Sequence, residues 1–210
     1  DFGALSGTAF TALLNQPLPE TVRKIDVDEE GVYWSKRVTL PYRPHIGTLS
    51  CSPELDSINS LTPDQHGGNM DLPDMGPGSI TYLPVRTPGG RLFIGDAHAC
   101  QGDGEVCVNA LEMGLTGTFT FLLHKAADLG TATWPRAETP THFIIMGFHE
   151  DLDLAMKQAL RGMIDFIIAR SALTRVQAYQ FCSLAVDFRV TQTVNGEKGV
   201  HGMLEKGILF

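Results

Sequence analysis

The clearest pattern of apolar and polar positions lies at residues 151–170, where apolar side chains recur at steps of three and four residues. That spacing places them on one face of an α-helix. Asp151 and Asp153 stand where negative charge favours a helix N-terminus, and Arg170 stands where positive charge favours the C-terminus. The pattern therefore predicts an amphipathic helix over these residues.

Shorter patterns predict a second helix and several strands. Thr174 can cap a helix that runs to Phe181. Four segments show the alternation or the apolar run of a strand, at residues 32–40, 118–123, 142–148 and 184–194. We expect the segment at 142–148 to be buried, because its apolar run is nearly continuous.

A hairpin and a short helix complete the predicted elements. Residues 80–85 and 91–96 flank the turn sequence Thr-Pro-Gly-Gly, which predicts a β-hairpin. Residues 105–113 follow two glycines and predict a short helix. These elements indicate an α+β chain with a β-rich, sandwich-like or barrel-like core and a few packed helices. We expect a segment at 1–40 that ends in a strand, then a single main domain at 41–210.

The composition of the 210 residues narrows the classes of partner. A net charge of −8 without a local Lys/Arg cluster disfavours nucleic acid and anionic membrane surfaces. No apolar run approaches ~20 residues, so we expect no membrane-spanning segment. The four cysteines form no Cys-x-x-Cys pair, which favours reduced thiols. With no secretory signal in view, we expect a cytoplasmic protein.

Two loops, at residues 64–75 and 95–106, concentrate acid/base and metal-ligating side chains among glycines. Asp96 and His98 are two residues apart at a strand end, so both point to the same face and could bind one cation. A lone Asp-x-His pair is more often a hydrogen-bonded loop element than a ligand pair. Two such loops in one chain favour a functional site.

The carboxylates that follow belong to the same predicted site. Gly102 and Gly104 allow a tight turn that brings Asp103 and Glu105 toward His98. Carboxylates this dense repel one another unless a cation or a shared proton lies between them. A mixed carboxylate and histidine set suits Zn²⁺ or another divalent transition metal better than Mg²⁺, and Ca²⁺ stays an alternative.

Several stretches of the sequence resemble the acetamidase/formamidase family of amide hydrolases, from about residue 41 to the C-terminus. They are HGGNMD at 66–71, YLPV at 82–85, GDAHACQGDGEV at 95–106 and AVDFRVTQ at 185–192, with PHIGTLS at 44–50 and GVHGML at 199–204. The resemblance implies an acetamidase/formamidase-like fold that hydrolyses a small non-peptide amide, linear or cyclic, to a carboxylate and ammonia or an amine.

The resemblance also implies that the two loops line the active site. The expected metal ligands are His66, Asp71, Asp96 and His98. A metal-activated water would attack the amide carbonyl.

We expect Glu105, with Asp103 as the second choice, to move the protons. Glu105 could equally be a carboxylate that stabilises a helix N-terminus. Asn69 and Gln101 are expected to bind the substrate, although Asn69 could simply accommodate a left-handed turn.

The sequence leaves other mechanisms and another function open. Cys100 and Cys107 lie beside the acidic loop, but neighbouring carboxylates raise a thiol pKa and weaken a nucleophile. His45 stands alone and is interpreted as a packed or surface histidine. The alternative function is a non-catalytic metal-binding subunit of an amidase-like complex. Family members have a longer N-terminal section. We therefore expect that a second chain supplies this section and completes the fold, or that processing has removed it. We also expect an oligomer.

Overall fold

The structure, a computed structural model, describes residues 1–7, 18–54, 57–125, 127 and 133–209. In this part of the chain the strands form three antiparallel sheets. The N-terminal sheet has the order β1 (Phe2–Gly7), β2 (Thr21–Asp28), β3 (Gly31–Ser35), β4 (Val38–Leu40). The central sheet has the order β6 (Gly67–Asn69), β5 (His45–Ser50), β8 (Phe93–His98). The C-terminal sheet has the order β11 (Val186–Gln192), β12 (Lys198–Glu205), β10 (His142–His149), β9 (Arg136–Glu138), β7 (Ile80–Tyr82).

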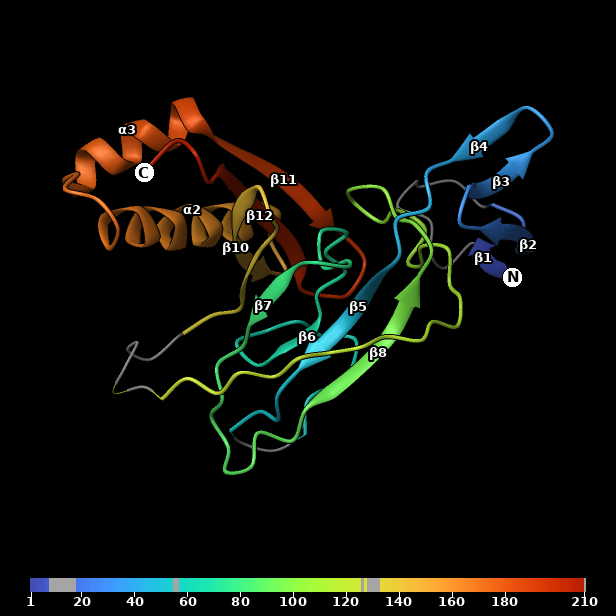
Figure 1. Ribbon diagram of the computed structural model, residues 1–210, viewed down its shortest axis with the longest axis horizontal. Coiled ribbons are helices and arrows are strands. Elements are labelled where there is room, and N and C mark those ends of the chain that lie inside the picture. Colours follow the sequence, from blue (N-terminus) through green and yellow to red (C-terminus); the bar gives the residue numbers. More distant parts are fainter. Residues whose placement is uncertain (8–17, 55–56, 126, 128–132, 210) are drawn as a thin grey trace.

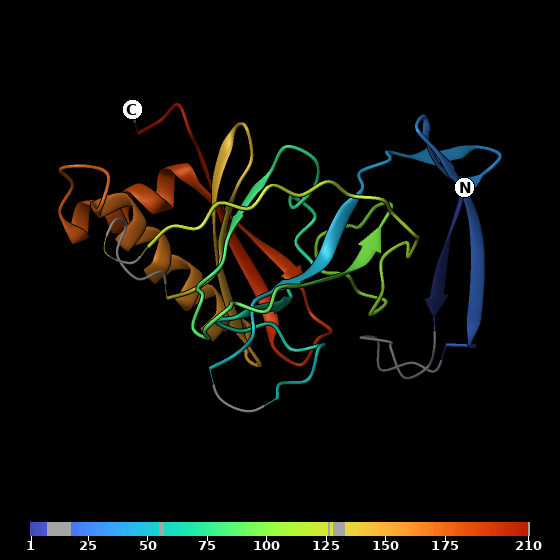
Figure 2. The ribbon, with the colours of Figure 1, turned by 60° about the horizontal axis from the view of Figure 1, so that its bottom comes forward.

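Two long helices accompany the C-terminal sheet, α2 (Leu152–Ile168) and α3 (Arg175–Ala185). Both views place these helices at one end of the molecule and the N-terminal sheet at the other, with the central sheet between them (Figures 1 and 2). The β-rich α+β fold predicted from the sequence is therefore confirmed. No helix among the described residues is long and apolar enough to cross a membrane.

The helix predicted from the apolar stripe is α2. Asp151 caps it, because the Asp151 side chain accepts a hydrogen bond of 3.0 Å from the backbone N–H of Leu154. The apolar face of α2 packs on β10 and β12. Gly147 on β10 permits this close approach, since a Cβ atom there would lie 2.5 Å from the backbone nitrogen of Ala159.

The second predicted helix and the buried strand are also confirmed. Thr174 begins α3 with a capping box, in which Thr174 and Gln177 each bond the other's backbone N–H. The helix continues to Ala185, so β11 begins two residues later than expected. Strand β10 covers the predicted run and pairs with β12 along its whole length.

The predicted hairpin at residues 80–96 is wrong. The turn itself exists, because the N–H of Gly90 donates to the carbonyl of Thr87 at 2.9 Å. The flanking strands nevertheless belong to different sheets: β7 pairs with β9, and β8 pairs with β5. Local turn chemistry therefore fixed the turn, and long-range pairing chose the partners of the strands.

Three further predictions are corrected by the backbone pairing. Residues 105–113 form no helix, because their backbone groups pair with distant segments, as in Ala99 N–H to the carbonyl of Leu111 at 2.8 Å. Residues 118–123 form no strand. Phe121 and Leu122 are exposed there, so the apolar positions of this segment do not pack into a sheet. The strand expected at 32–40 is a hairpin, in which β3 pairs with β4.

The N-terminal sheet joins the rest through β1. Ala4 and Glu112 exchange backbone hydrogen bonds of 2.8 and 3.0 Å, and Glu112 also bridges to His98 at the end of β8. Leu111 is buried beside Gly3, where a Cβ atom would lie 2.5 Å from Leu111 Cγ. The segment after β8 therefore lies between the two sheets and carries the residues described next.

Candidate functional site

His98 lies at the centre of a buried acidic cluster. It is the last residue of β8, and its side chain is fully buried. Its Nε2 atom lies 3.2 Å from Asp96 Oδ1 and 3.1 Å from Glu112 Oε1, at angles outside hydrogen-bond geometry. Burial alone would lower the pKa of His98, but the two carboxylates outweigh it and raise that pKa to about 10.

A second group shares the same histidine. Asp71, His98 and Glu105 each offer one ligand atom, and these atoms lie within 4.8 Å of one another, as do those of Asp96, His98 and Glu112. Burial raises the pKa of Asp71 to about 6. Burial, together with the charge of Asp71, raises the pKa of Glu105 to about 10. Burial and mutual repulsion therefore disfavour the ionised forms of Asp71 and Glu105.

Three atoms at the centre of the cluster make no hydrogen bond to any described residue. They are Asp71 Oδ1, His98 Nε2 and Glu105 Oε2, and all three are buried. Gly47 on β5 leaves space beside Asp71, Asp96 and His98. A Cβ atom there would lie 2.5 Å from Asp96 Oδ2, 2.9 Å from His98 Cε1 and closer still to Asp71 Oδ1.

This donor set fits a divalent cation. An uncompensated buried polar atom is costly, so three together indicate a missing partner. The imidazole nitrogen suits zinc and other divalent transition metals, and carboxylate oxygens bind divalent cations generally.

Backbone strain marks the same residues. Asp71, Asp96 and Glu105 have φ values of 46°, 60° and 41°, in the left-handed region that side chains rarely adopt. Such conformations persist where the surrounding structure holds them, and they concentrate at functional sites. Each of the three places a carboxylate in the cluster.

His45 contacts the second ring nitrogen of His98, and Gln101 contacts His45. His45 Nε2 lies 3.2 Å from His98 Nδ1 and 2.9 Å from Gln101 Oε1, and His45 Nδ1 lies 3.1 Å from the carbonyl of Arg43. The amide nitrogen of Gln101 donates to the backbone carbonyl of Asp71 at 2.7 Å. Both ends of the Gln101 amide thus contact protein groups, and the side chain fixes the orientation of the site.

Two asparagines hold the carboxylate of Asp71. Asn69 donates to Asp71 Oδ2 at 2.9 Å, and its own oxygen accepts a hydrogen bond from Thr48. Asn195 donates to the same Asp71 oxygen and, at 3.0 Å, to the backbone carbonyl of Asn69. Gln192 holds the loop of Asn195, because its oxygen accepts from the N–H of Asn195 at 3.1 Å.

Comparison with known proteins gives the same assignment as the motifs. The family model of the Acetamidase/Formamidase family matches residues 56–200, more than half of the chain. The chain belongs to the acetamidase/formamidase family. The resemblance drawn from the sequence motifs is thereby confirmed.

Two solved structures and one curated relative show how similar this chain is to other proteins of the family. The acetamidase of Yersinia enterocolitica is 48% identical, with a TM-score of 0.82 over 100% of this chain and 62% of that one. A predicted acetamidase/formamidase of Thermoanaerobacter tengcongensis is 26% identical, with a TM-score of 0.85 over 99% of this chain and 68% of that one. The formamidase of Methylophilus methylotrophus is 41% identical over 130 residues, 53% of this chain and 32% of that protein. The chain thus spans less than two thirds of the Yersinia acetamidase and of the Methylophilus formamidase.

Four of the eight expected site residues of this family member meet in the cluster: Asp71, Asp96, His98 and Glu105. Asn69 and Gln101 contact Asp71 from outside it.

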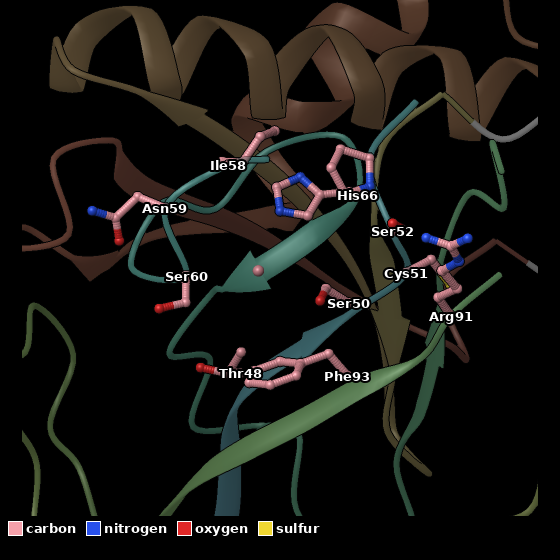
Figure 3. Close-up of a pocket in the computed structure, with 12 residues that line it drawn as sticks. Thr48, Ser50, Cys51, Ser52, Ile58, Asn59, Ser60, His66, Arg91 and Phe93 are labelled. Atoms are coloured by element: carbon pink, nitrogen blue, oxygen red, sulfur yellow. The ribbon is translucent and has the colours of Figure 1, made fainter. Parts of the chain in front are cut away.

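His66 and Asp103 belong to neither ligand group among the described residues. His66 lines a separate cavity of about 240 Å³, whose walls also include Thr48, Ser50 and Phe93 (Figure 3). Burial lowers the pKa of His66 and raises that of Asp103.

Sequence reasoning missed three members of the site. Glu112 lies within the helix that the sequence predicts at 105–113, and the sequence around His45 is typical of a packed or surface histidine. Asn195 lies in a turn 124 residues from Asp71, and no spacing links the two positions. His45 stands in the PHIGTLS stretch of the family resemblance, which is the one signal that pointed to it.

Proposed function

We propose that this protein hydrolyses a small non-peptide amide, linear or cyclic, to a carboxylate and ammonia or an amine. The observation that carries the proposal is the cluster of four carboxylates around the buried His98, in which Asp71 Oδ1, His98 Nε2 and Glu105 Oε2 make no hydrogen bond to the described residues. Relatives named acetamidase and formamidase support an amide as the substrate class.

Asp96, His98 and Glu112 are the residues that we propose hold a divalent cation, zinc in preference to calcium. Among the described residues they form one of the two groups with ligand atoms within 4.8 Å of one another, and the carboxylates of Asp96 and Glu112 are part-exposed. A cation there would polarise the amide carbonyl and increase the acidity of the attacking water.

Asp71 and Glu105 are the groups that move protons in this proposal. Asp71 Oδ1, which accepts no hydrogen bond from the described residues, can accept a proton from the attacking water. Burial and the charge of Asp71 raise the pKa of Glu105, which favours its protonated form, so Glu105 can give a proton to the nitrogen as the carbon–nitrogen bond breaks.

The surrounding polar side chains keep these groups in place. Asn69 and Asn195 both donate to Asp71 Oδ2, so Asp71 Oδ1 is the oxygen left to accept a proton. His45 and Gln101 fix the ring of His98 from its other nitrogen. Such support lowers the cost of reorganisation during the reaction.

The test is ammonia or amine release from formamide, acetamide and a small lactam by the purified protein. Chelation should abolish activity and zinc should restore it. Glu105→Gln should lower kcat by about 10²-fold or more, because it removes the proton donor. Glu205→Gln, at an exposed position outside the cluster, is the matched control and should leave kcat unchanged.

The same experiments distinguish amide hydrolysis from the second candidate function, a non-catalytic metal-binding subunit. It is favoured if no amide is hydrolysed while zinc binds in a manner that depends on His98. Hydrolysis that persists after complete chelation would refute the role of the cation and leave the carboxyl groups as the sole catalysts.

A further inference from the structure

The turn that joins β11 to β12 contacts both loops of the acidic cluster. Strand β11 ends at Gln192 and β12 begins at Lys198, and the turn between them lies beside the central sheet (Figure 1). The pairing of β11 with β12 shifts register between Val190 and Gln192. Such irregularities bend a strand and interrupt its ladder. The end of β11 and the turn can therefore bond segments outside their own sheet.

On one side the turn bonds the loop of Asp71. Asn195 donates to Asp71 Oδ2. Gln192 is fully buried, and its side-chain oxygen accepts from the N–H groups of Val194 at 2.8 Å and Asn195 at 3.1 Å. The amide nitrogen of Gln192 donates to the carbonyl of Glu197 at 2.6 Å. The buried amide of Gln192 thus fixes the shape of the turn that carries Asn195.

On the other side the turn bonds the backbone that leads into Glu105. The N–H of Gly104 donates to the carbonyl of Thr191 at 2.9 Å. The carbonyl of Gly104 accepts from the N–H of Thr193 at 3.1 Å and from the Thr193 hydroxyl at 2.9 Å. Glu105 itself has a φ value of 41°, a conformation that persists where surrounding contacts hold it. These three bonds hold the peptide next to Glu105.

Strand β12 anchors the end of β11. Thr191 Oγ1 lies 2.7 Å from His201 Nδ1, and both residues are buried. A buried polar pair of this kind is costly to separate, because neither group can turn to water instead. The contacts with Asp71 and Gly104 are therefore made from a base that is fixed on the C-terminal sheet.

We propose that the turn between β11 and β12 sets the separation of Asp71 and Glu105, with Thr193 as a positioning residue for Glu105. The inference rests on the proposed function, because it concerns the two groups that move protons there. A displacement of about 1 Å in such a site can cost about 10²-fold in rate. Among the described residues, the Thr193 hydroxyl bonds Gly104 and none of the proposed cation ligands.

Thr193→Val tests the role of the hydroxyl, because it keeps the shape of the side chain and the backbone bond to Gly104. With the amide that the unaltered protein hydrolyses fastest, kcat should fall about tenfold, the upper range for one hydrogen bond. KM and zinc affinity should stay unchanged. Thr193→Ser retains the donor and should restore kcat to within about twofold of the unaltered protein.

Thr87→Val is the matched control. The Thr87 hydroxyl also donates to a backbone carbonyl, that of Ser52 at 2.9 Å, so the same substitution removes the same kind of bond outside the cluster. It should lower stability to denaturant about as much as Thr193→Val does, and it should leave kcat unchanged. An equal loss of kcat in the two variants would overturn the positioning role and leave a structural one.

A second measurement does not depend on hydrolysis. The N–H of Glu105 donates to Gly102 at 3.2 Å, and the N–H of Val108 donates to Glu105 at 3.1 Å. Hydrogen exchange across residues 102–108 therefore reports how firmly the backbone around Glu105 is held. Exchange there should become faster in Thr193→Val and stay unchanged in Thr87→Val. Unchanged exchange in Thr193→Val would show that its hydroxyl does not hold this segment.

The two measurements distinguish the possible failures. Hydrolysis by the unaltered protein, with kcat unchanged in Thr193→Val, overturns the inference and leaves the proposed function intact. Absence of hydrolysis by the unaltered protein overturns the proposed function and this role of Thr193 together, even if exchange at 102–108 responds to the substitution.

Discussion

Gly47→Ala tests whether the space between Asp71, Asp96 and His98 holds a cation, without removing any ligand. The added methyl group would lie 2.5 Å from Asp96 Oδ2 and 2.9 Å from His98 Cε1, where ordinary contacts begin at 3.4 Å. The ligand atoms must therefore move apart by roughly 0.5 to 1 Å, a displacement that can cost about 10²-fold in a catalytic site.

The magnitude for binding follows from the same displacement. We expect zinc affinity to fall about 10- to 100-fold, or about 1.4 to 2.7 kcal/mol, comparable to the loss of a residue that orients a metal ligand. The free energy of unfolding should fall by about 1 to 3 kcal/mol, as for other overpacked sites. Competition with a chromophoric chelator measures the affinity, and denaturant unfolding without metal measures the stability.

Gly114→Ala is the control, since a Cβ atom at Gly114 meets nothing within 4 Å. It should change neither quantity. If Gly47→Ala binds zinc as tightly as the unaltered protein while unfolding normally, the cation does not occupy the space in front of Gly47. The assignment of Asp96 and His98 as ligands of that cation would then be wrong.

Three further predictions concern stability. Asn195→Ala leaves a buried oxygen of Asp71 without one of its donors, so unfolding in denaturant should cost about 1 to 3 kcal/mol less; an unchanged midpoint would exclude this support. Burial lowers the pKa of His201 to about 4, below its ordinary value of 6.5, so the unfolded state takes up the proton first and stability should fall by about 3 kcal/mol between pH 6.5 and pH 4. In denaturant titrations across that range, His201→Gln should show a smaller slope with pH, and an equal slope would contradict the assignment. Asp151→Ala should lower stability by about 0.5 to 2 kcal/mol in thermal unfolding through the lost N-cap, and Asp153→Ala should lower it less, since Asp153 caps no N–H.

Local patterns predicted the elements whose stability is mostly local. The apolar stripe and cap residues identified α2 and α3, because helix periodicity and capping act between residues within a few positions. The nearly continuous apolar run identified β10, the central partner of β9 and β12. These elements needed no knowledge of the rest of the chain.

Patterns failed where backbone groups pair at long range. Residues 105–113 have glycines in front and apolar positions within, yet Leu111 pairs with Ala99 and Cys100, and Glu112 with Ala4. A local helix would have left the backbone groups of those distant segments without partners. The same competition separated β7 from β8 on either side of a well-formed turn.

Short-range spacing and contiguous motifs were enough to predict the late helices, the buried strand, the family and four members of the cluster. The contacts of Glu112 and His45 with His98, the contact of Asn195 with Asp71 and the position of His66 in a separate cavity came only from the folded chain. The physical reason is that side chains from β5, β8, the segment after β8 and the turn before β12 meet only when three sheets assemble. No local preference records those pairings, whose partners lie as far as 124 residues apart in the chain.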